Sequence, residues 1–308
     1  MIGGPTATGK TGLAIRLALA LARLDRPVEI LSADSRQVYR GMDVGTAKPS
    51  IAERQGVVHH LLDLVEPDAA FSVADFLRAA GPVLDDLARR AGVAILVGGT
   101  GLWLRGLATG LDVDASPADA GLRRRLEAEL VADGPASLAA RLRREAPLAA
   151  ARTDLRNPRR VVRALEIATL RGDGPPVAPL GYGGPVLRLN LALDPGLNRS
   201  WIERRAIGQL ESGLPEEAAR LRARFGSNLR SFSAIGYAEA FELLDGRLDR
   251  DGFLAVNVAR NVAFARRQRT WFRADAFGDV QVEFDAADQP FEPAFEAARR
   301  LLGRERLS

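Results

Sequence analysis

The feature that most constrains this chain is a glycine-rich motif at its start, G-x-x-x-x-G-K-T, at residues 4–11. Segment 11–24 follows it directly, and its apolar residues repeat with helical spacing. A glycine-rich loop that opens a helix lets backbone N–H groups surround an anion at the positive helix end. The motif therefore predicts a phosphate or diphosphate site formed by Gly4, Pro5, Thr6, Ala7, Thr8, Gly9, Lys10 and Thr11.

Lysine is scarce in this chain, whose 43 basic residues include only Lys10 and Lys48 as lysines. An arginine guanidinium cannot replace a compact ammonium among phosphate oxygens. We therefore expect Lys10 to place its charge on the outer phosphate and the Thr11 hydroxyl to be a ligand of Mg²⁺.

Short apolar runs alternate with helical segments in two parts of the chain. Strand-like runs at 28–31, 92–97 and 186–193 and a weaker one at 280–284 are separated by segments of helical spacing. This alternation predicts an α/β fold, a parallel sheet flanked by helices as in P-loop NTPases. Only Met1 and Ile2 precede Gly3, so we expect a truncated first strand and a lower stability than that of a chain extended by apolar residues.

The middle of the chain differs from the rest in composition and in hydrophobic pattern. Segment 117–171 is almost continuously helical in pattern, rich in Ala, Leu and Arg, with breaks at Gly134-Pro135 and Pro147, and a turn-rich stretch follows it at 172–185. We therefore predict a P-loop core at 1–112 and 183–308, interrupted by an all-helical domain at 113–182.

The net charge of +4 hides two basic segments. Segment 120–163 has 11 arginines and five acidic residues, and segment 257–273 has five arginines and no acidic residue. This distribution predicts a polyanion partner such as a nucleic acid, and solvated helix faces are the alternative.

Composition excludes several classes of protein. The absence of cysteine excludes disulfides, thiolate nucleophiles and Cys-ligated metals, and two histidines cannot build a His-rich metal centre. No apolar run approaches the roughly 18–20 residues that span a bilayer, and the first residues lack the regions of a signal peptide. We expect a cytoplasmic protein without membrane contact.

Asp34 follows the strand-like run 28–31, at the edge of a parallel sheet where ligand-facing residues lie. It can be a magnesium ligand, a general base or only a helix or turn cap. The run 93–97 ends in Gly98-Gly99-Thr100-Gly101 without the carboxylate that usually holds magnesium in an ATPase. The sequence therefore predicts a P-loop whose chemistry differs from that of a kinase.

Seven further motifs follow the P-loop in one order, at 34–39 (DSRQVY), 43–49 (DVGTAKP), 59–63 (HHLLD), 98–103 (GGTGLW), 157–166 (NPRRVVRALE), 234–237 (AIGY) and 266–273 (RRQRTWFR). Together they resemble the tRNA dimethylallyltransferase (tRNA isopentenyltransferase) family. The resemblance runs from residue 4 to about 273.

The resemblance implies that the P-loop holds the diphosphate of dimethylallyl diphosphate instead of ATP. The five-carbon group then goes to N6 of the adenosine immediately 3′ of the anticodon, and diphosphate leaves. It also implies the tRNA anticodon stem-loop as the partner. We further expect Mg²⁺ as a cofactor, from the Thr11 hydroxyl of the P-loop, and a monomeric protein.

Site residues follow from the same resemblance. Asp34 would be the general base and Thr100 would help to hold the reacting centre. Lys10, the third catalytic residue, would stabilise the charge of the leaving diphosphate. Asp34, Thr100, Ser35, Arg36 and Gln37 would contact the flipped adenine and its neighbours. Further tRNA contacts are expected from Arg123, Arg159, Arg160, Val161, Val162 and Arg163. Arg160 and Arg163 are three residues apart on one helix face, so they can also clamp the diphosphate.

Other motif residues have structural interpretations. We expect His59 and His60 to pack or to orient a loop, Gly236 and Tyr237 to serve a turn and a core contact, and Trp271 to lie in the core. The role of Lys48 stays open. The chain departs from the family pattern at Val58, at Asn261-Val262 and at Arg266, which weakens the expected tRNA contacts of the C-terminal helix.

Three alternatives remain at this point. An isopentenyltransferase for free adenine nucleotides needs no extended basic face, and this chain has two basic segments. A P-loop small-molecule kinase with the arginine-rich insertion as its lid would lack the usual strand-end aspartate. A non-catalytic RNA-binding module would leave the Lys10–Thr11 cradle unused.

Overall fold

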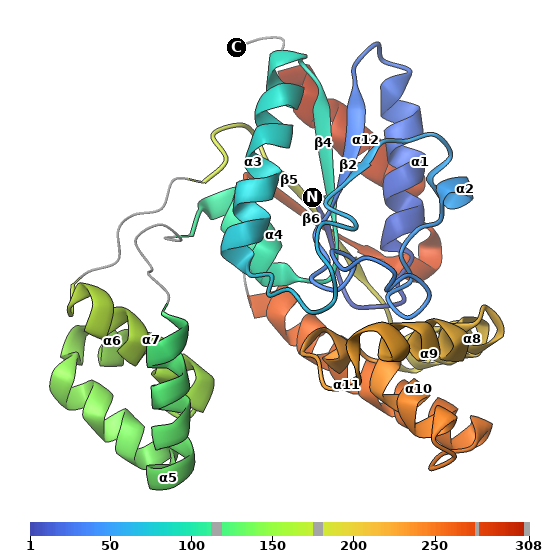
Figure 1. Ribbon diagram of the computed structural model, residues 1–308. Coiled ribbons are helices and arrows are strands. Elements are labelled where there is room, and N and C mark those ends of the chain that lie inside the picture. The colour runs from blue at the N-terminus through green and yellow to red at the C-terminus, as the bar shows by residue number, and fades with distance from the viewer. Residues whose placement is uncertain (112–118, 175–180, 275–276, 305–308) are drawn as a thin grey trace. The chain divides into compact units, whose positions relative to one another are not determined.

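The computed structural model describes residues 1–111, 119–174, 181–274 and 277–304 (Figure 1). The chain forms two compact units: Met1–Thr109 with Tyr182–Ser308, and Gly110–Gly181. The smaller unit corresponds to the segment predicted as a helical insertion at 113–182.

The larger unit is built on one sheet of six parallel strands, in the order β3-β2-β4-β1-β5-β6. The strands are β1 (Ile2–Gly3), β2 (Val28–Ser32), β3 (His59–His60), β4 (Val93–Val97), β5 (Leu187–Ala192) and β6 (Val280–Asp285). Although β1 has only two residues, it pairs with both β4 and β5 at the centre of the sheet. The predicted parallel α/β sheet is confirmed.

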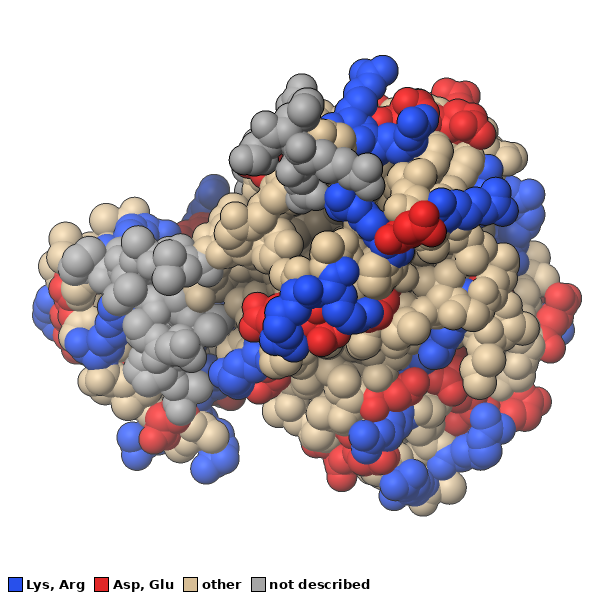
Figure 2. All heavy atoms as spheres, turned by 90° about the horizontal axis from the view of Figure 1, so that it is seen from above, with Lys and Arg blue, Asp and Glu red and all other residues tan. Residues whose placement is uncertain are grey.

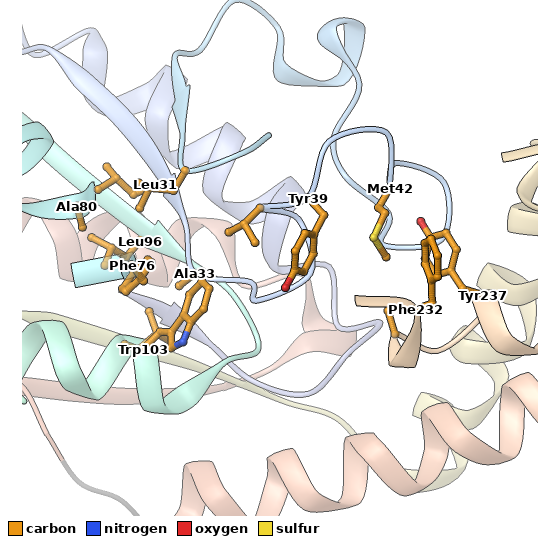
Figure 3. Packing of buried hydrophobic residues seen from close by; sticks show 14 of the residues in the cluster. Leu31, Ala33, Tyr39, Met42, Phe76, Ala80, Leu96, Trp103, Phe232 and Tyr237 are labelled. Carbon is orange, nitrogen blue, oxygen red and sulfur yellow. The ribbon is translucent and has the colours of Figure 1, made fainter. Parts of the chain in front are cut away.

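Helices cover both faces of this sheet because neighbouring strand residues point to opposite sides. Ile30 and Ile95 pack with residues of α1 (Lys10–Ala22) and α12 (Phe291–Arg304). Leu31 and Leu96 face the opposite way, onto α3 (Val73–Arg89) and α4 (Gly101–Thr109), where Phe76, Ala80 and Trp103 complete the core (Figure 3). The unit's remaining helices are α2 (Ile51–Arg54), α8 (Pro195–Glu211), α9 (Leu214–Phe225), α10 (Tyr237–Leu244) and α11 (Arg250–Ala274).

Three short elements, α2, β3 and α4, are not predicted by the sequence pattern. The glycine-rich stretch 98–101 indicates a loop by composition, yet α4 begins at Gly101. A Cβ atom at Gly101 would lie closer than 3.0 Å to the Trp271 ring of α11. This glycine therefore serves the close approach of two helices, and such a contact leaves no periodic signal in the sequence.

Gly98 also lies at a crowded position, since a Cβ atom there would come closer than 3.0 Å to the backbone oxygen of Ala33. We expect Gly98→Ala to lower the free energy of unfolding by about 3 kcal/mol, because a backbone group cannot move aside as a side chain can. The matched control is Gly81→Ala in α3, where nothing lies within 4 Å of the new methyl group. There we expect a gain of about 0.5–1 kcal/mol. Denaturant unfolding measures both, and equal midpoints would contradict the prediction.

All secondary-structure elements that the structure describes in the smaller unit are helices, as predicted. It contains α5 (Ala120–Glu145), α6 (Pro147–Arg152) and α7 (Pro158–Arg171). Gly134 interrupts α5 with φ 80° and ψ 166°, at the predicted Gly-Pro break. Its own core is formed by Leu122, Leu126, Leu138, Leu142, Val161, Val162 and Leu165.

Within the described ranges, no helix combines the length and the apolar character that crossing a membrane requires.

Candidate active site

The predicted phosphate loop connects β1 to α1 and has the backbone of an anion cradle. Gly4, Ala7 and Gly9 have positive φ values of 139°, 58° and 75°. A Cβ atom on Gly4 would lie closer than 3.0 Å to the backbone oxygen of Leu191, so only glycine fits. The Thr8 hydroxyl donates to the Pro5 oxygen at 2.9 Å and closes the turn. The loop thus brings its amides to the N-terminus of α1, where an anion is stabilised.

Side chains from α8 and α11 hold this loop from the C-terminal half of the chain. The Thr6 amide donates to Gln268 Oε1 at 2.8 Å, and Asn198 Nδ2 donates to the Thr6 oxygen at 3.0 Å. Arg205 Nη1 donates to the Thr6 hydroxyl at 3.0 Å. Of these three residues, only Gln268 lies in a sequence motif. Asn198 and Arg205 carry no signal that sequence reasoning could have used.

Lys10 begins α1, and its ammonium donates to the Pro5 oxygen. Burial, and secondarily the neighbouring Arg205 guanidinium, lowers the pKa of Lys10 to about 7, while Asp34 acts in the opposite direction. The ammonium is therefore held in a place that disfavours its charge until an anion arrives. This is the expected behaviour of a phosphate-binding lysine.

Asp34 lies just past the carboxyl end of β2, as predicted. Its Oδ1 accepts a hydrogen bond from the Arg36 amide at 2.8 Å. The amide of Ser35, which lies between these two residues, donates to Thr100 Oγ1 at 3.1 Å. Thr100 thereby ties the Asp34 turn to the start of α4. The Ser32 hydroxyl donates to Gln37 Oε1 at 2.9 Å across the same turn.

One cavity of about 1140 Å³ joins the phosphate loop to Asp34. The predicted residues that line it are Thr6, Ala7, Thr8, Gly9, Lys10, Thr11, Asp34 and Gln37. Gly4, Pro5, Ser35, Arg36 and Thr100 are not among the lining residues. The cavity is also lined by Arg205, Gln268 and Phe264 of the C-terminal helices and by most of segment 43–48.

The predicted tRNA residues of the smaller unit fall into three groups. Arg159 and Arg160 are exposed on α7, whereas Val161 and Val162 are buried in the core of the unit. Arg123 Nη2 and Arg163 Nη1 both donate to Glu166 Oε2, at 2.6 and 2.7 Å. The Glu166 side chain is fully buried, while both arginines are about one-third exposed. Glu166 therefore presents two guanidinium groups side by side at the surface.

Glu166→Gln should destabilise the smaller unit by about 2 kcal/mol, since a buried carboxylate that accepts from two arginines and from the Asp119 amide is replaced by a neutral amide. Hydrogen exchange in α5 and α7 is the appropriate measurement, with an expected acceleration of about 30-fold. Glu145→Gln is the control, because Glu145 pairs with Arg141 and Arg144 in an exposed position and should cost under about 1 kcal/mol. Equal exchange rates in the two variants would refute the role of Glu166.

The remaining motif residues have structural contacts. Lys48 is buried between Asp43 and Asp63, at 2.5 Å from each. His60 Nε2 lies 2.6 Å from Glu29 Oε2, and His59 Nδ1 lies 2.9 Å from the Val57 oxygen. Gly236, with φ 110°, turns the chain into α10.

No group of three or more His, Cys, Asp or Glu side chains that could hold a metal occurs among residues 1–111, 119–174, 181–274 and 277–304. The cavity does offer oxygen atoms from Thr11 and Asp34. This donor set fits a hard cation that takes most of its ligands from a diphosphate and from water.

Arginine side chains are exposed at both ends of the larger unit. Figure 2 looks onto the end of the sheet opposite α8–α11, and basic and acidic side chains are interspersed there. At the other end, α11 contributes the exposed residues Arg266, Arg267 and Arg273, and Phe264 opens into the cavity. The cavity and the basic helix thus share one end of the unit.

A P-loop after the central strand of a parallel sheet, with a cavity at the carboxyl ends of the strands, defines the larger unit as a P-loop α/β protein. The IPP transferase family matches residues 37–275. The tRNA dimethylallyltransferases of Azoarcus sp. and Anaeromyxobacter dehalogenans are 41% and 45% identical, over 97% and 89% of this chain and 95% and 91% of theirs. The chain belongs to this family.

Solved structures agree with this assignment. The full-length tRNA isopentenylpyrophosphate transferase of Bacillus halodurans is 35% identical, with a TM-score of 0.70 over 99% of this chain and 96% of its own. A eukaryotic dimethylallyltransferase described as acting on tRNA is 24% identical and shares the fold, with a TM-score of 0.78 over 96% of this chain and 76% of its own.

Proposed function

We propose that this protein transfers the dimethylallyl group of dimethylallyl diphosphate to N6 of the tRNA adenosine immediately 3′ of the anticodon, releasing diphosphate. The observation that carries the proposal is a cavity that joins a phosphate loop to a carboxylate at the end of β2. The activity named for the family's relatives supports it. We expect the protein to act as a monomer in the cytoplasm.

The chemistry requires both ends of this cavity. The lone pair of N6 forms a bond to C1 of the allyl group, and the bond from C1 to the diphosphate oxygen breaks with its electron pair leaving on oxygen. The exocyclic amine is a weak nucleophile, so its proton must be removed as the bond forms. Asp34 is the carboxylate that we assign to accept this proton.

The leaving group gains charge as the bond breaks, so its stabilisation decides the rate. The loop amides, Lys10 and the cavity-lining Arg205 are placed to supply it. Mg²⁺ bound by the Thr11 hydroxyl and by the diphosphate would add Lewis-acid stabilisation.

The acceptor is proposed to be single-stranded RNA at the anticodon loop. A base must leave its stack to enter a cavity of this kind, and loops are where such bases are accessible. Arg266 and Arg267 of α11 are exposed at the cavity end, and the Arg267 guanidinium lies 5.8 Å from the centre of the exposed Phe264 ring. We assign the exposed Arg159 and Arg160, together with Arg123 and Arg163, to backbone contacts of the tRNA.

A direct assay tests the proposal. The protein is incubated with dimethylallyl diphosphate, Mg²⁺ and bulk tRNA, and the nucleosides are analysed by mass spectrometry. We expect adenosine that has gained one C5H8 unit. Parallel samples contain AMP in place of tRNA, or ATP with small alcohols. Prenylated AMP alone would identify a mononucleotide transferase, and ATP consumption without prenylation would identify a kinase.

A further inference from the structure

Segment 43–48 forms one wall of the cavity but has no regular secondary structure. Asp43, Val44, Thr46, Ala47 and Lys48 all line the cavity. A wall of this kind keeps its shape only when its backbone groups find partners. The partners come from helices far away in the sequence.

Glu217 of α9 supplies the largest share of these partners. Its Oε2 accepts the amides of Asp43 and Val44 at 3.0 and 2.8 Å, and its Oε1 accepts the Gly45 amide at 3.1 Å. The residue is only 2% exposed. Burying a carboxylate is costly unless several donors face it, and here three consecutive amides do so.

Tyr237 of α10 completes the set, because its hydroxyl donates to Glu217 Oε1 at 2.6 Å. Burial, and secondarily the Glu217 carboxylate, raises the pKa of Tyr237 far above its ordinary value, so the phenol remains a donor. A Cβ atom on Gly45 would lie closer than 3.0 Å to this ring. Met42 and Tyr237 belong to the same buried cluster (Figure 3).

The other edge of the wall is bound from α8. Gln209 Nε2 donates to the oxygens of Val44 and Gly45, at 2.8 and 2.9 Å. Three N–H groups of this stretch therefore face Glu217, and two of its carbonyl groups face Gln209. Buried side chains thus bind both donor and acceptor groups of this backbone segment.

Lys48 stabilises the C-terminal end of segment 43–48. Its ammonium, 3% exposed, donates to the Tyr39 oxygen at 2.9 Å and lies 2.5 Å from Asp43 and from Asp63. The buried ammonium and these two half-exposed carboxylates hold the segment against the turn at residue 63.

The wall in turn holds the Asp34 turn. Gln37 Nε2 donates to the oxygens of Thr46 and Ala47, at 3.3 and 3.2 Å, and Gln37 Oε1 accepts from Ser32 at the end of β2. Both the nitrogen and the oxygen of the Gln37 side-chain amide therefore form hydrogen bonds within the protein. The contacts run from α9 through the wall to the strand end that carries Asp34.

The phosphate loop has separate supports. Thr6 is held by Gln268, Asn198 and Arg205, none of which contacts segment 43–48 through a hydrogen bond among those found for the described residues. A change at Glu217 should therefore disturb the acceptor side of the cavity and leave the diphosphate side in place.

We propose that Glu217 is a positioning residue for the acceptor base: through segment 43–48 and Gln37 it sets the place of the base opposite Asp34, without touching either substrate. The inference rests on the proposed function. It predicts that acceptor and donor parameters respond differently to the loss of this carboxylate.

The test compares Glu217→Gln with Glu216→Gln, which removes an exposed carboxylate one residue earlier in the same helix turn. Tyr237→Phe is the milder variant, since it removes one of the four donors and keeps the carboxylate. Each variant is assayed in a temperature range where circular dichroism shows the native fold. The measured quantities are kcat/KM for tRNA and the Kd of inorganic diphosphate.

For Glu217→Gln we expect kcat/KM for tRNA to fall about 30-fold, because a displacement of well under 1 Å at a reacting centre has effects of this size. Tyr237→Phe should lose about 3-fold, and Glu216→Gln should stay within 2-fold of the wild type. The Kd of diphosphate should stay within 2-fold in all three variants.

A parallel loss of diphosphate affinity and tRNA turnover would overturn the inference, since it would show general loosening of the fold. Unchanged tRNA turnover in Glu217→Gln and Tyr237→Phe would also overturn it. If Glu217→Gln does not fold, Tyr237→Phe alone decides by the same two measurements. A wild-type protein that transfers no prenyl group would instead refute the proposed function.

Discussion

Asp34→Asn should lower kcat for prenyl transfer by a factor of about 10³, with the Kd of tRNA changed less than about 3-fold. Asparagine keeps an oxygen for the Arg36 amide, which Asp34 Oδ1 accepts at 2.8 Å, so the turn should survive. Only the capacity to take the N6 proton is lost. Single-turnover kinetics and tRNA binding by fluorescence anisotropy give the two quantities.

Asp34→Ala serves as the companion variant, because it removes both the base and the turn hydrogen bond. If Asp34 acts mainly as a cap, alanine should be damaging and asparagine harmless. A variant Asp34→Asn that keeps its turnover, or that loses mainly tRNA affinity, would refute the assignment as base.

Lys10→Arg should be almost as damaging as Lys10→Met, with kcat/KM for dimethylallyl diphosphate lowered about 10²- to 10³-fold in both. The chain uses arginine for 41 of its 43 basic residues, so arginine is its common choice elsewhere. At this site the ammonium must fit within the phosphate loop, beside the Pro5 oxygen. A planar guanidinium is too large to take this place. Arg23→Lys, at the other end of α1, is the control and should be neutral. An active Lys10→Arg enzyme would contradict the expectation.

The pH dependence of donor binding should follow the same lysine. Its folded-state pKa of about 7 lies below the ordinary 10.5, so the charge is disfavoured by folding, and stability should rise with pH between these values. An anion favours the charged form, so binding takes up a proton above pH 7. We expect the affinity for dimethylallyl diphosphate to fall up to about tenfold per pH unit between pH 7 and 9. In Lys10→Met this pH dependence should be absent, and an identical pH profile would contradict the role of Lys10.

Local sequence was sufficient for the features that depend on neighbouring residues. The glycines and Lys10 of the phosphate loop, the apolar runs of the parallel strands and the helical pattern of the insertion each encode their structure over a few residues. Asp34 could be placed at the cavity because the end of a parallel strand is a defined location.

The supports of the site could not be predicted in the same way. Arg205 and Asn198 hold Thr6, and Glu217 holds segment 43–48, across separations of more than 170 residues. Such contacts depend on how helices pack and leave no periodic pattern. The predicted contact of Gln37 with the adenine remains a prediction, although the structure shows its amide already bound within the protein.

By itself, the sequence predicted a P-loop α/β core, a helical insertion and a carboxylate near the phosphate loop, since each follows from short-range pattern. Only the tertiary structure decided the role of Lys48 and the electrostatic environment of Lys10. Lys10 lines the cavity with a lowered pKa, whereas Lys48 is neutralised between two aspartates. The physical reason is that the environment of a charge is set by groups brought together from distant parts of the chain.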